Sequence, residues 1–177
     1  MKTLRVSALL AFIFAAAAAL AQQPAPAAPT PAPILSAKTI FISNGGADAG
    51  LFPEPFSGDP SRGYEELYAM LKAHSPYRLV DDPSQADLVL ELRLTAPYGP
   101  SHPDKVEGTS DPLPMFTLII YDRRSHYVLW TLTRTVEYAV LQKTHDRNFD
   151  TAISYLGGQF LALGGHAPNA AAGAPAP

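Results

Sequence analysis

The chain contains no cysteine. This absence excludes a disulfide framework, a thiolate metal site and a cysteine nucleophile, and it removes the residue that a bacterial lipid anchor requires. The sequence also lacks a phosphate-loop lysine motif and a Gly-x-Ser-x-Gly nucleophile elbow. Its five histidines form no His-x-His or His-Glu-x-x-His pair, so their spacing does not indicate a zinc site. We therefore assign no catalytic, cofactor-binding or metal-binding residue from motifs.

The glycine-rich segment 45–50 follows a predicted strand, as a dinucleotide-binding loop would. That fingerprint needs a glycine at its third position and a helix directly after it. Here the third position is Ala47, and Pro53 and Pro55 prevent such a helix. The segment is typical of a plain turn, and no cofactor is expected.

Positive charge is also scarce. The whole chain has 13 basic and 16 acidic residues, and its formal net charge is −3. Lys2 and Arg5 lie in the predicted signal segment, so the remaining chain has 11 basic and 16 acidic residues. An acidic surface repels phosphate backbones, so we expect no nucleic-acid partner.

The first 21 residues have the features of a secretory signal peptide. Lys2 and Arg5 precede an apolar run, and Ala19-Leu20-Ala21 matches the small-x-small cleavage pattern. The run is shorter than the roughly 20 residues that span a membrane. We predict a periplasmic or secreted protein, cleaved after Ala21, with membrane attachment only if this segment stays uncleaved.

Proline and alanine dominate both ends of the mature chain. Residues 22–37 predict an extended linker of polyproline character, and the tail 166–177 predicts disorder. Two roles fit the linker: a stalk that holds the domain away from a surface, and a solvated tether without a partner. A single domain is predicted between them, from residue 38 to residue 165.

The first half of that domain predicts three strands and a helix. Residues 38–43 predict a short strand that ends at the Asn-Gly-Gly sequence 44–46. Asp59 and Pro60 predict a helix start, and Pro76 predicts its end. Strands are predicted at 77–80 and 86–95, and the alternating leucines of the second indicate an antiparallel sheet with one solvated face.

A β-hairpin is the clearest element of the sequence. Two runs rich in β-branched and aromatic residues, within 115–140, flank the charged turn Asp-Arg-Arg-Ser. Side chains alternate between the two faces of a strand, so the second arm has an apolar face and a threonine face. The apolar face is predicted to contain Val128, Trp130, Leu132, Val136 and Tyr138, interrupted only by Arg134. The other face is predicted to contain Thr131, Thr133, Thr135 and Glu137. These threonines could pair with another chain if the arm is an edge strand.

A second helix is predicted near the end of the domain. Residues 142–148 are polar and are expected to end the last strand, and an apolar stripe at helical spacing begins at Phe149. Gly164 is the predicted C-terminal cap. Gly157 and Gly158 either permit close packing on the sheet or end the helix early.

The order of these elements predicts the fold class. It is α+β, a two-layer sandwich in which a mostly antiparallel sheet of four or five strands carries two helices on one face.

Candidate partner-binding residues lie in two places. The loop 96–114 is longer than most connections, and loops of this length are usually functional or disordered; its five prolines favour disorder. At the hairpin tip, two adjacent arginines could contact an anionic partner. The candidates are Tyr98, His102, Asp104 and Lys105 in the loop, and Arg123 and Arg124 at the tip.

An enzymatic alternative depends on His145, Asp146 and Asp150. A small metal-dependent or acid/base hydrolase would need these side chains to converge in a pocket. The structural interpretation is that carboxylates near a helix N-terminus favour the helix dipole and cap free amides.

Two segments resemble small bacterial envelope domains. The first is YRLVDDPSQADLVL, residues 77–90, and the second is Ile-Tyr-Asp at 120–122 followed by Val-Leu-Trp at 128–130. In plan, such domains are similar to the TolB amino-terminal and CsgG-like domains. The resemblance implies a non-enzymatic module of the cell envelope that binds an envelope or secreted protein. It leaves the oligomeric state open.

Overall fold

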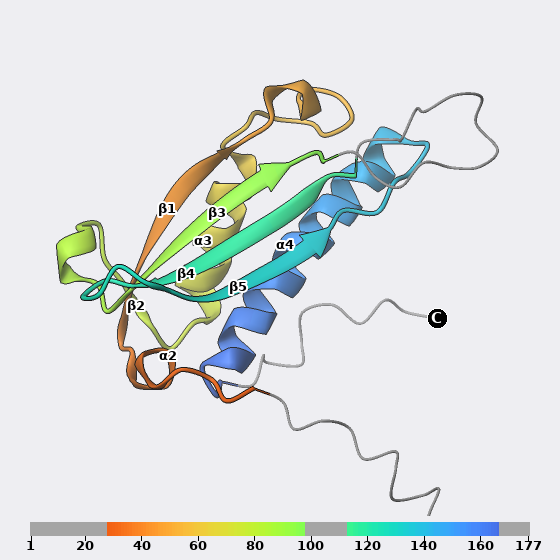
Figure 1. The fold of residues 1–177 in the computed structure, drawn as a ribbon. Coiled ribbons are helices and arrows are strands. Elements are labelled where there is room, and N and C mark those ends of the chain that lie inside the picture. The colour runs from red at the N-terminus through yellow and green to blue at the C-terminus, as the bar shows by residue number, and fades with distance from the viewer. Residues whose placement is uncertain (1–27, 98–112, 167–177) are drawn as a thin grey trace, which may run out of the picture.

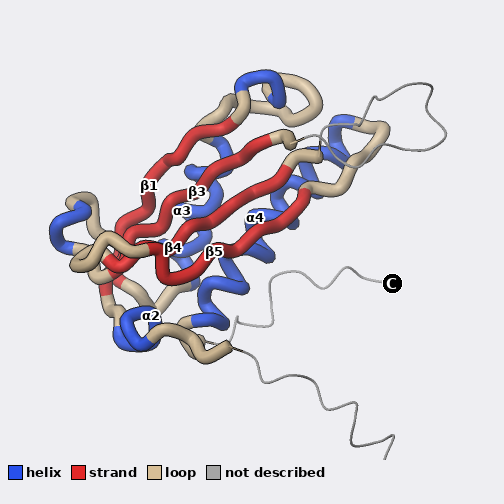
Figure 2. The backbone as a smooth tube through the Cα atoms, in the orientation of Figure 1, coloured by secondary structure: helices blue, strands red, loops and turns tan. Residues whose placement is uncertain are grey.

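A computed structural model describes residues 28–97 and 113–166 of the chain. These residues form one five-stranded sheet with helices on one of its faces (Figures 1 and 2). The predicted fold class, a two-layer α+β sandwich, is confirmed. The signal peptide, most of the linker, the tail after residue 166 and loop residues 98–112 lie outside the described ranges.

The sheet has the strand order β2-β1-β3-β4-β5. Its strands are β1 (Thr39–Ala47), β2 (Arg78–Leu79), β3 (Leu88–Thr95), β4 (Met115–Asp122) and β5 (Val128–Thr135). β1 is parallel to both of its neighbours, β2 and β3, whereas β3, β4 and β5 are successively antiparallel. The sheet therefore contains both parallel and antiparallel pairs, with the parallel pairs around β1. β2 and β5 are its two edge strands.

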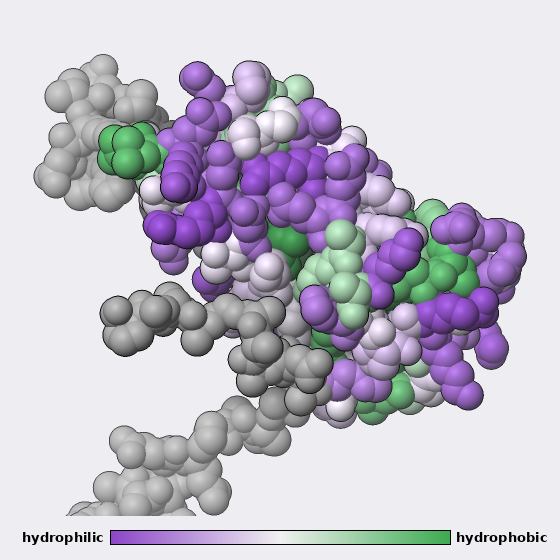
Figure 3. All heavy atoms as spheres, turned by 180° about the vertical axis from the view of Figure 1, so that it is seen from behind, coloured by the Kyte–Doolittle hydropathy of each residue, from purple (hydrophilic) through white to green (hydrophobic). Residues whose placement is uncertain are grey.

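Two long helices cover one face of this sheet. They are α3 (Arg62–His74) and α4 (Gln142–Leu163), which lie side by side behind the strands in Figure 1. Seen from the helix side, the outer surface is mainly hydrophilic (Figure 3), as expected for amphipathic helices. The other face of the sheet carries no helix in the described part of the chain.

The core lies between the sheet and the two helices. Alternate residues of β3 and β4 point into it, because a strand presents every second side chain to the same face. Leu88, Leu90, Phe116, Leu118 and Ile120 have no exposed surface. They pack in one cluster with the apolar stripes of the helices, which include Leu67, Leu71, Phe149, Ile153, Leu156 and Phe160.

The close approach of α3 and α4 depends on Gly157. A Cβ atom built at this position would lie 1.8 Å from the terminal methyl of Met70 and 3.4 Å from Leu67 Cδ1. Gly157 thus permits close packing against α3, not against the sheet as predicted, and the helix continues past it to its Gly164 cap.

Several predicted boundaries are wrong. The end of the predicted linker forms a short helix, α2 (Ala32–Ser36), because Ile34 is fully buried in the core. β1 continues through the Asn-Gly-Gly sequence to Ala47, because the positive φ of Gly46 (88°) produces an irregularity in register and does not end the strand. α3 begins two residues later than Pro60, because the Asp59 carboxylate accepts a hydrogen bond from Ser61 N, at 2.7 Å, in a preceding turn.

α4 begins seven residues before Phe149. Residues 142–148 do not end the last strand; they form the first two turns of this helix. The apolar stripe extends backwards through His145, which is 6% exposed and lies four residues before Phe149.

The face assignment in the second hairpin arm is correct from Trp130 to Val136 and wrong at both ends of the predicted arm. Register between β4 and β5 shifts between Ile120 and Tyr121, so that Tyr121 pairs with Val128. Val128 is 54% exposed, while Leu129 packs against the core. A β-bulge therefore reverses the predicted parity at these two positions. Tyr138, also predicted on the apolar face, is 81% exposed beyond the end of β5.

Candidate partner-binding surfaces

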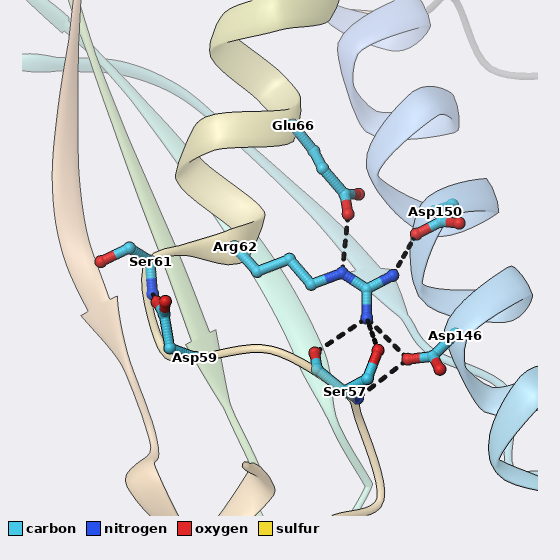
Figure 4. Close-up of polar contacts among 7 residues, drawn as sticks. All are labelled: Ser57, Asp59, Ser61, Arg62, Glu66, Asp146 and Asp150. Atoms are coloured by element: carbon cyan, nitrogen blue, oxygen red, sulfur yellow. Dashed lines mark hydrogen bonds and ion pairs between the residues drawn. The ribbon is translucent and has the colours of Figure 1, made fainter. Parts of the chain in front are cut away.

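The carboxylates of the proposed hydrolase site bind an arginine. The early start of α4 places Asp146 and Asp150 one turn apart on the side that faces α3 (Figure 4). Arg62 donates from Nη1 to Asp146 Oδ1 at 2.6 Å and from Nη2 to Asp150 Oδ1 at 2.5 Å. Its Nε donates to Glu66 Oε1 at 2.7 Å. We call Arg62, Glu66, Asp146 and Asp150, together with Ser57, the Arg62 cluster.

The Arg62 cluster joins three segments of the fold. Arg62 Nη1 also donates to the carbonyl oxygen of Ser57, at 3.0 Å, and Ser57 N donates to Asp146 Oδ1 at 2.9 Å. The guanidinium carbon lies 4.4 Å from the centre of the Phe149 ring. One cation thus fixes the 52–58 loop, α3 and α4 together, which is a structural role.

Three carboxylates share this one guanidinium. Burial raises the pKa of Asp146, but hydrogen bonds from Arg62 and Ser57 outweigh it and lower that pKa below its usual value. Burial raises the pKa of Glu66, and repulsion from Asp150 adds to the effect although Arg62 opposes it. Burial alone would lower the pKa of Arg62, but its bonds to Glu66 and Asp146 raise it, so Arg62 stays charged.

His145 does not join these carboxylates. Its ring lies edge-on between Phe56 and Tyr138, with centroid distances of 5.9 and 5.0 Å. Its Nδ1 is buried and has no hydrogen-bond partner. Within residues 28–97 and 113–166, no three His, Asp or Glu side chains are arranged to hold a metal ion. The convergence that the hydrolase alternative requires is not formed by these three residues.

The arginines at the hairpin tip line an open pocket of about 670 Å³. Val89 and Tyr121, which pair on the open face of the sheet, are among its lining residues. Neither Arg123 nor Arg124 forms an ion pair within 4.0 Å of a described carboxylate. The lining residues are Pro83, Ser84, Val89, Tyr121, Asp122, Arg123, Arg124 and His126.

Nearby carboxylates offset the charge of this pocket. The Ser125 side chain is the main cause that lowers the pKa of Asp122, and Arg124 contributes. The Ser84 side chain similarly lowers the pKa of Asp82, with a contribution from Arg123. Both aspartates stay ionised and cap local turns, so the tip is not a strongly cationic surface.

The two sets of predicted candidates are separated in the sequence by β4. Arg123 and Arg124 follow the end of β4, whereas the loop 96–114 precedes its start. Tyr98, His102, Asp104 and Lys105 lie outside the described residues.

The strand β5 forms an open edge of the sheet. It pairs with β4 on one side, and in the described part of the chain no strand lies on its other side. The N–H of Val136 donates to the carbonyl oxygen of Pro114 at 2.8 Å. This bond shows which β5 residues form hydrogen-bonded pairs with β4 and which do not. Because bonded and non-bonded pairs alternate, Trp130, Leu132 and Arg134 direct their backbone groups towards β4.

The intervening threonines direct their N–H and C=O groups outwards. These residues are Thr131, Thr133 and Thr135, and their side chains are exposed on the open face. β5 contains no proline and no lysine, the residues that commonly block an edge. The sequence predicted that these threonines could pair with another chain if β5 is an edge strand, and the topology confirms that condition.

Neither the scan of protein families nor the search of curated proteins finds a match. Among solved structures, the chain is similar to the PelC dodecamer from Paraburkholderia phytofirmans, with TM-score 0.40 and 15% identity over 78% of this chain and 94% of that chain. It is also similar to a DUF4136 family protein from Bacteroides thetaiotaomicron, with TM-score 0.48 and 13% identity over 75% and 93% of the two chains. A third similar structure is lipoprotein B from Nitrosomonas europaea, with TM-score 0.38 and 12% identity over 81% and 89%.

The predicted likeness to TolB amino-terminal and CsgG-like domains stays a prediction. Within the two described ranges, no helix combines the length and apolar character needed to cross a membrane.

Proposed function

We propose that the chain is an exported, non-enzymatic binding module that takes up an extended segment of an envelope or secreted protein beside β5. The observation that carries this proposal is the outward row of backbone donors and acceptors on Thr131, Thr133 and Thr135. An added strand would satisfy these groups with main-chain hydrogen bonds, each worth roughly 1 kcal/mol net.

The two edges of the sheet support β5 as the docking side. β2, at the other edge, has only two residues, and it offers little ladder for a partner. β5 has eight residues, and its side chains are β-branched or aromatic at most positions. The export part of the proposal is based on the predicted signal peptide in residues 1–21.

A photo-crosslinking experiment in the exporting bacterium tests the proposal. A photoreactive amino acid at Thr133 is expected to form an adduct with one defined partner. The same amino acid at Thr151, an exposed position on α4, serves as the matched control and is expected to form none. Adducts of equal yield at both positions, or none at Thr133, would contradict strand addition.

A proline substitution separates the backbone from the side chain. Thr133→Pro removes the outward N–H and should abolish the adduct formed from position 131. Thr133→Val keeps the N–H and the β-branched shape and should preserve it.

A further inference from the structure

We infer that the partner segment alternates apolar and polar side chains and carries a carboxylate that pairs with Arg134. This inference rests on the proposed function, because it describes the chemistry of the strand that would lie beside β5. It is based on the side chains that β5 and α4 leave half-covered along the open edge.

The helix side of the edge is apolar. Trp130 and Leu132 pair across the sheet with Ile120 and Leu118, which are fully buried. Yet Trp130 and Leu132 are themselves only partly buried, although they pack against the core. Nothing in the described part of the chain lies beyond them in the sheet. Aliphatic side chains of an added strand would cover this remaining surface.

Arg134 breaks the apolar row, and the described part of the chain offers it no carboxylate partner. It occupies the next helix-side position, opposite Phe116. Its guanidinium carbon lies 4.3 Å from the centre of the Tyr155 ring, and Tyr155 on α4 is 48% exposed. Among the described residues, no Asp or Glu oxygen lies within 4.0 Å of Arg134. The Tyr155 ring holds the guanidinium in place, and no described carboxylate occupies its donors.

On the open face of the sheet, a partner strand would need different side chains. There an added strand meets Thr131, Thr133 and Thr135, which are exposed and polar with β-branched side chains. Threonine and serine pair favourably with threonine across strands. The two faces of the partner strand therefore require different chemistry at alternate positions.

The alternation of hydrogen-bonded and non-hydrogen-bonded pairs determines the order of side chains along the partner segment. In an antiparallel addition, Trp130, Leu132 and Arg134 would form the non-hydrogen-bonded pairs, in which side chains approach most closely. A segment that reads acidic-x-apolar-x-apolar from its N-terminus would place the carboxylate opposite Arg134 and the apolar side chains opposite Leu132 and Trp130.

Two synthetic peptides test this chemistry. The first, acetyl-Thr-Glu-Thr-Val-Thr-Val-Thr-amide, has the inferred order, and the second carries lysine in place of glutamate. Binding is followed by the fluorescence of Trp130, the single tryptophan of the chain, which lies at the proposed contact. We expect the full chain to bind the glutamate peptide about tenfold more tightly than the lysine peptide.

Charge reversal at one position gives the decisive comparison. Arg134→Glu should reverse the preference between the two peptides, and Arg134→Gln should remove it. Arg124→Glu, at the hairpin tip, is the matched control and should leave the preference unchanged. Urea unfolding of each variant verifies that it is folded.

The outcomes separate this inference from the proposed function. Equal affinity for both peptides, together with a Thr133 adduct in cells, would overturn the inference and leave strand addition standing. Absence of peptide binding with a Thr133 adduct present would also overturn the inferred order. Absence of the Thr133 adduct would overturn the proposed function itself, and this inference with it.

Discussion

The Arg62 cluster and the β5 edge use the same kind of side chain in opposite ways. Arg62 is surrounded by three carboxylates and the Ser57 carbonyl, and it joins a loop to two helices. Arg134 stacks on one ring and binds no described carboxylate. The charge of Arg62 is neutralised by carboxylates of the same chain, whereas no described carboxylate neutralises the charge of Arg134. The difference separates a polar group that serves the fold from one that, under our proposal, binds another molecule.

Hydrogen exchange should show the largest contrast along β5. We expect the outward amides of Thr131, Thr133 and Thr135 to exchange at least about a hundredfold faster than those of Leu132 and Arg134, which bond to β4. Two-dimensional NMR in deuterated buffer measures these rates. Uniform protection along the strand would mean that the outer side of β5 is already covered.

Removing each arginine should separate their roles in stability. Arg62→Ala is expected to lower the free energy of unfolding by about 2 kcal/mol, because three carboxylates then repel one another in a half-buried site. Arg134→Ala should change it by only about 0.5 kcal/mol, the size of an exposed cation–π contact. Urea denaturation provides both values. Equal losses would remove the distinction between the two sites.

Acid should weaken the Arg62 cluster through Asp146. Its pKa is lowered in the folded state, so its contribution to stability is present above its unfolded pKa and is lost as pH falls through the folded pKa. Asp146→Asn should cost about 1 kcal/mol at neutral pH and flatten the fall in stability between about pH 5 and pH 2. Thermal unfolding across this range tests the sign. A steeper fall in the variant would contradict the assignment.

Glu66 should act in the opposite direction and more weakly. Burial raises its pKa, so its charged form costs stability, and that cost appears as pH rises from its unfolded pKa through its folded pKa. Glu66→Gln keeps an acceptor for Arg62 Nε and should stabilise the fold by about 0.5 kcal/mol at pH 7. The gain should vanish at about pH 3, where both states are protonated. A loss of stability at neutral pH would show that the ion pair outweighs burial.

Local periodicity was sufficient to predict most of the architecture. The alternation in β3 and β5 and the helical stripe after Phe149 each reflect burial against the same core, so they identified the elements and their inner faces. Periodicity did not reveal the first two turns of α4, because these turns are mostly polar. Their Asp146 binds Arg62, a residue more than 80 positions earlier in the sequence. Ile34 was missed for the same reason: its burial depends on contacts with distant residues.

The site could be predicted only in part. The sequence singled out the β5 threonines and left open whether the strand is an edge, because strand order is not encoded in any one strand. It also grouped Asp146 with Asp150, which bind the same arginine, although that partner is structural. The sequence marked Arg134 as a break in the apolar row, but its significance depends on the Tyr155 ring beneath it and on the absence of a described carboxylate beside it.

The β-bulge at Val128 and Leu129 has a consequence for how firmly any strand is held. Regular outward pairing starts only after the bulge and ends with Thr135, so the available ladder consists of three outward residues. So short a pairing region favours rapid dissociation and exchange of a bound strand over permanent attachment. It also disfavours edge-to-edge pairing of identical copies into fibres.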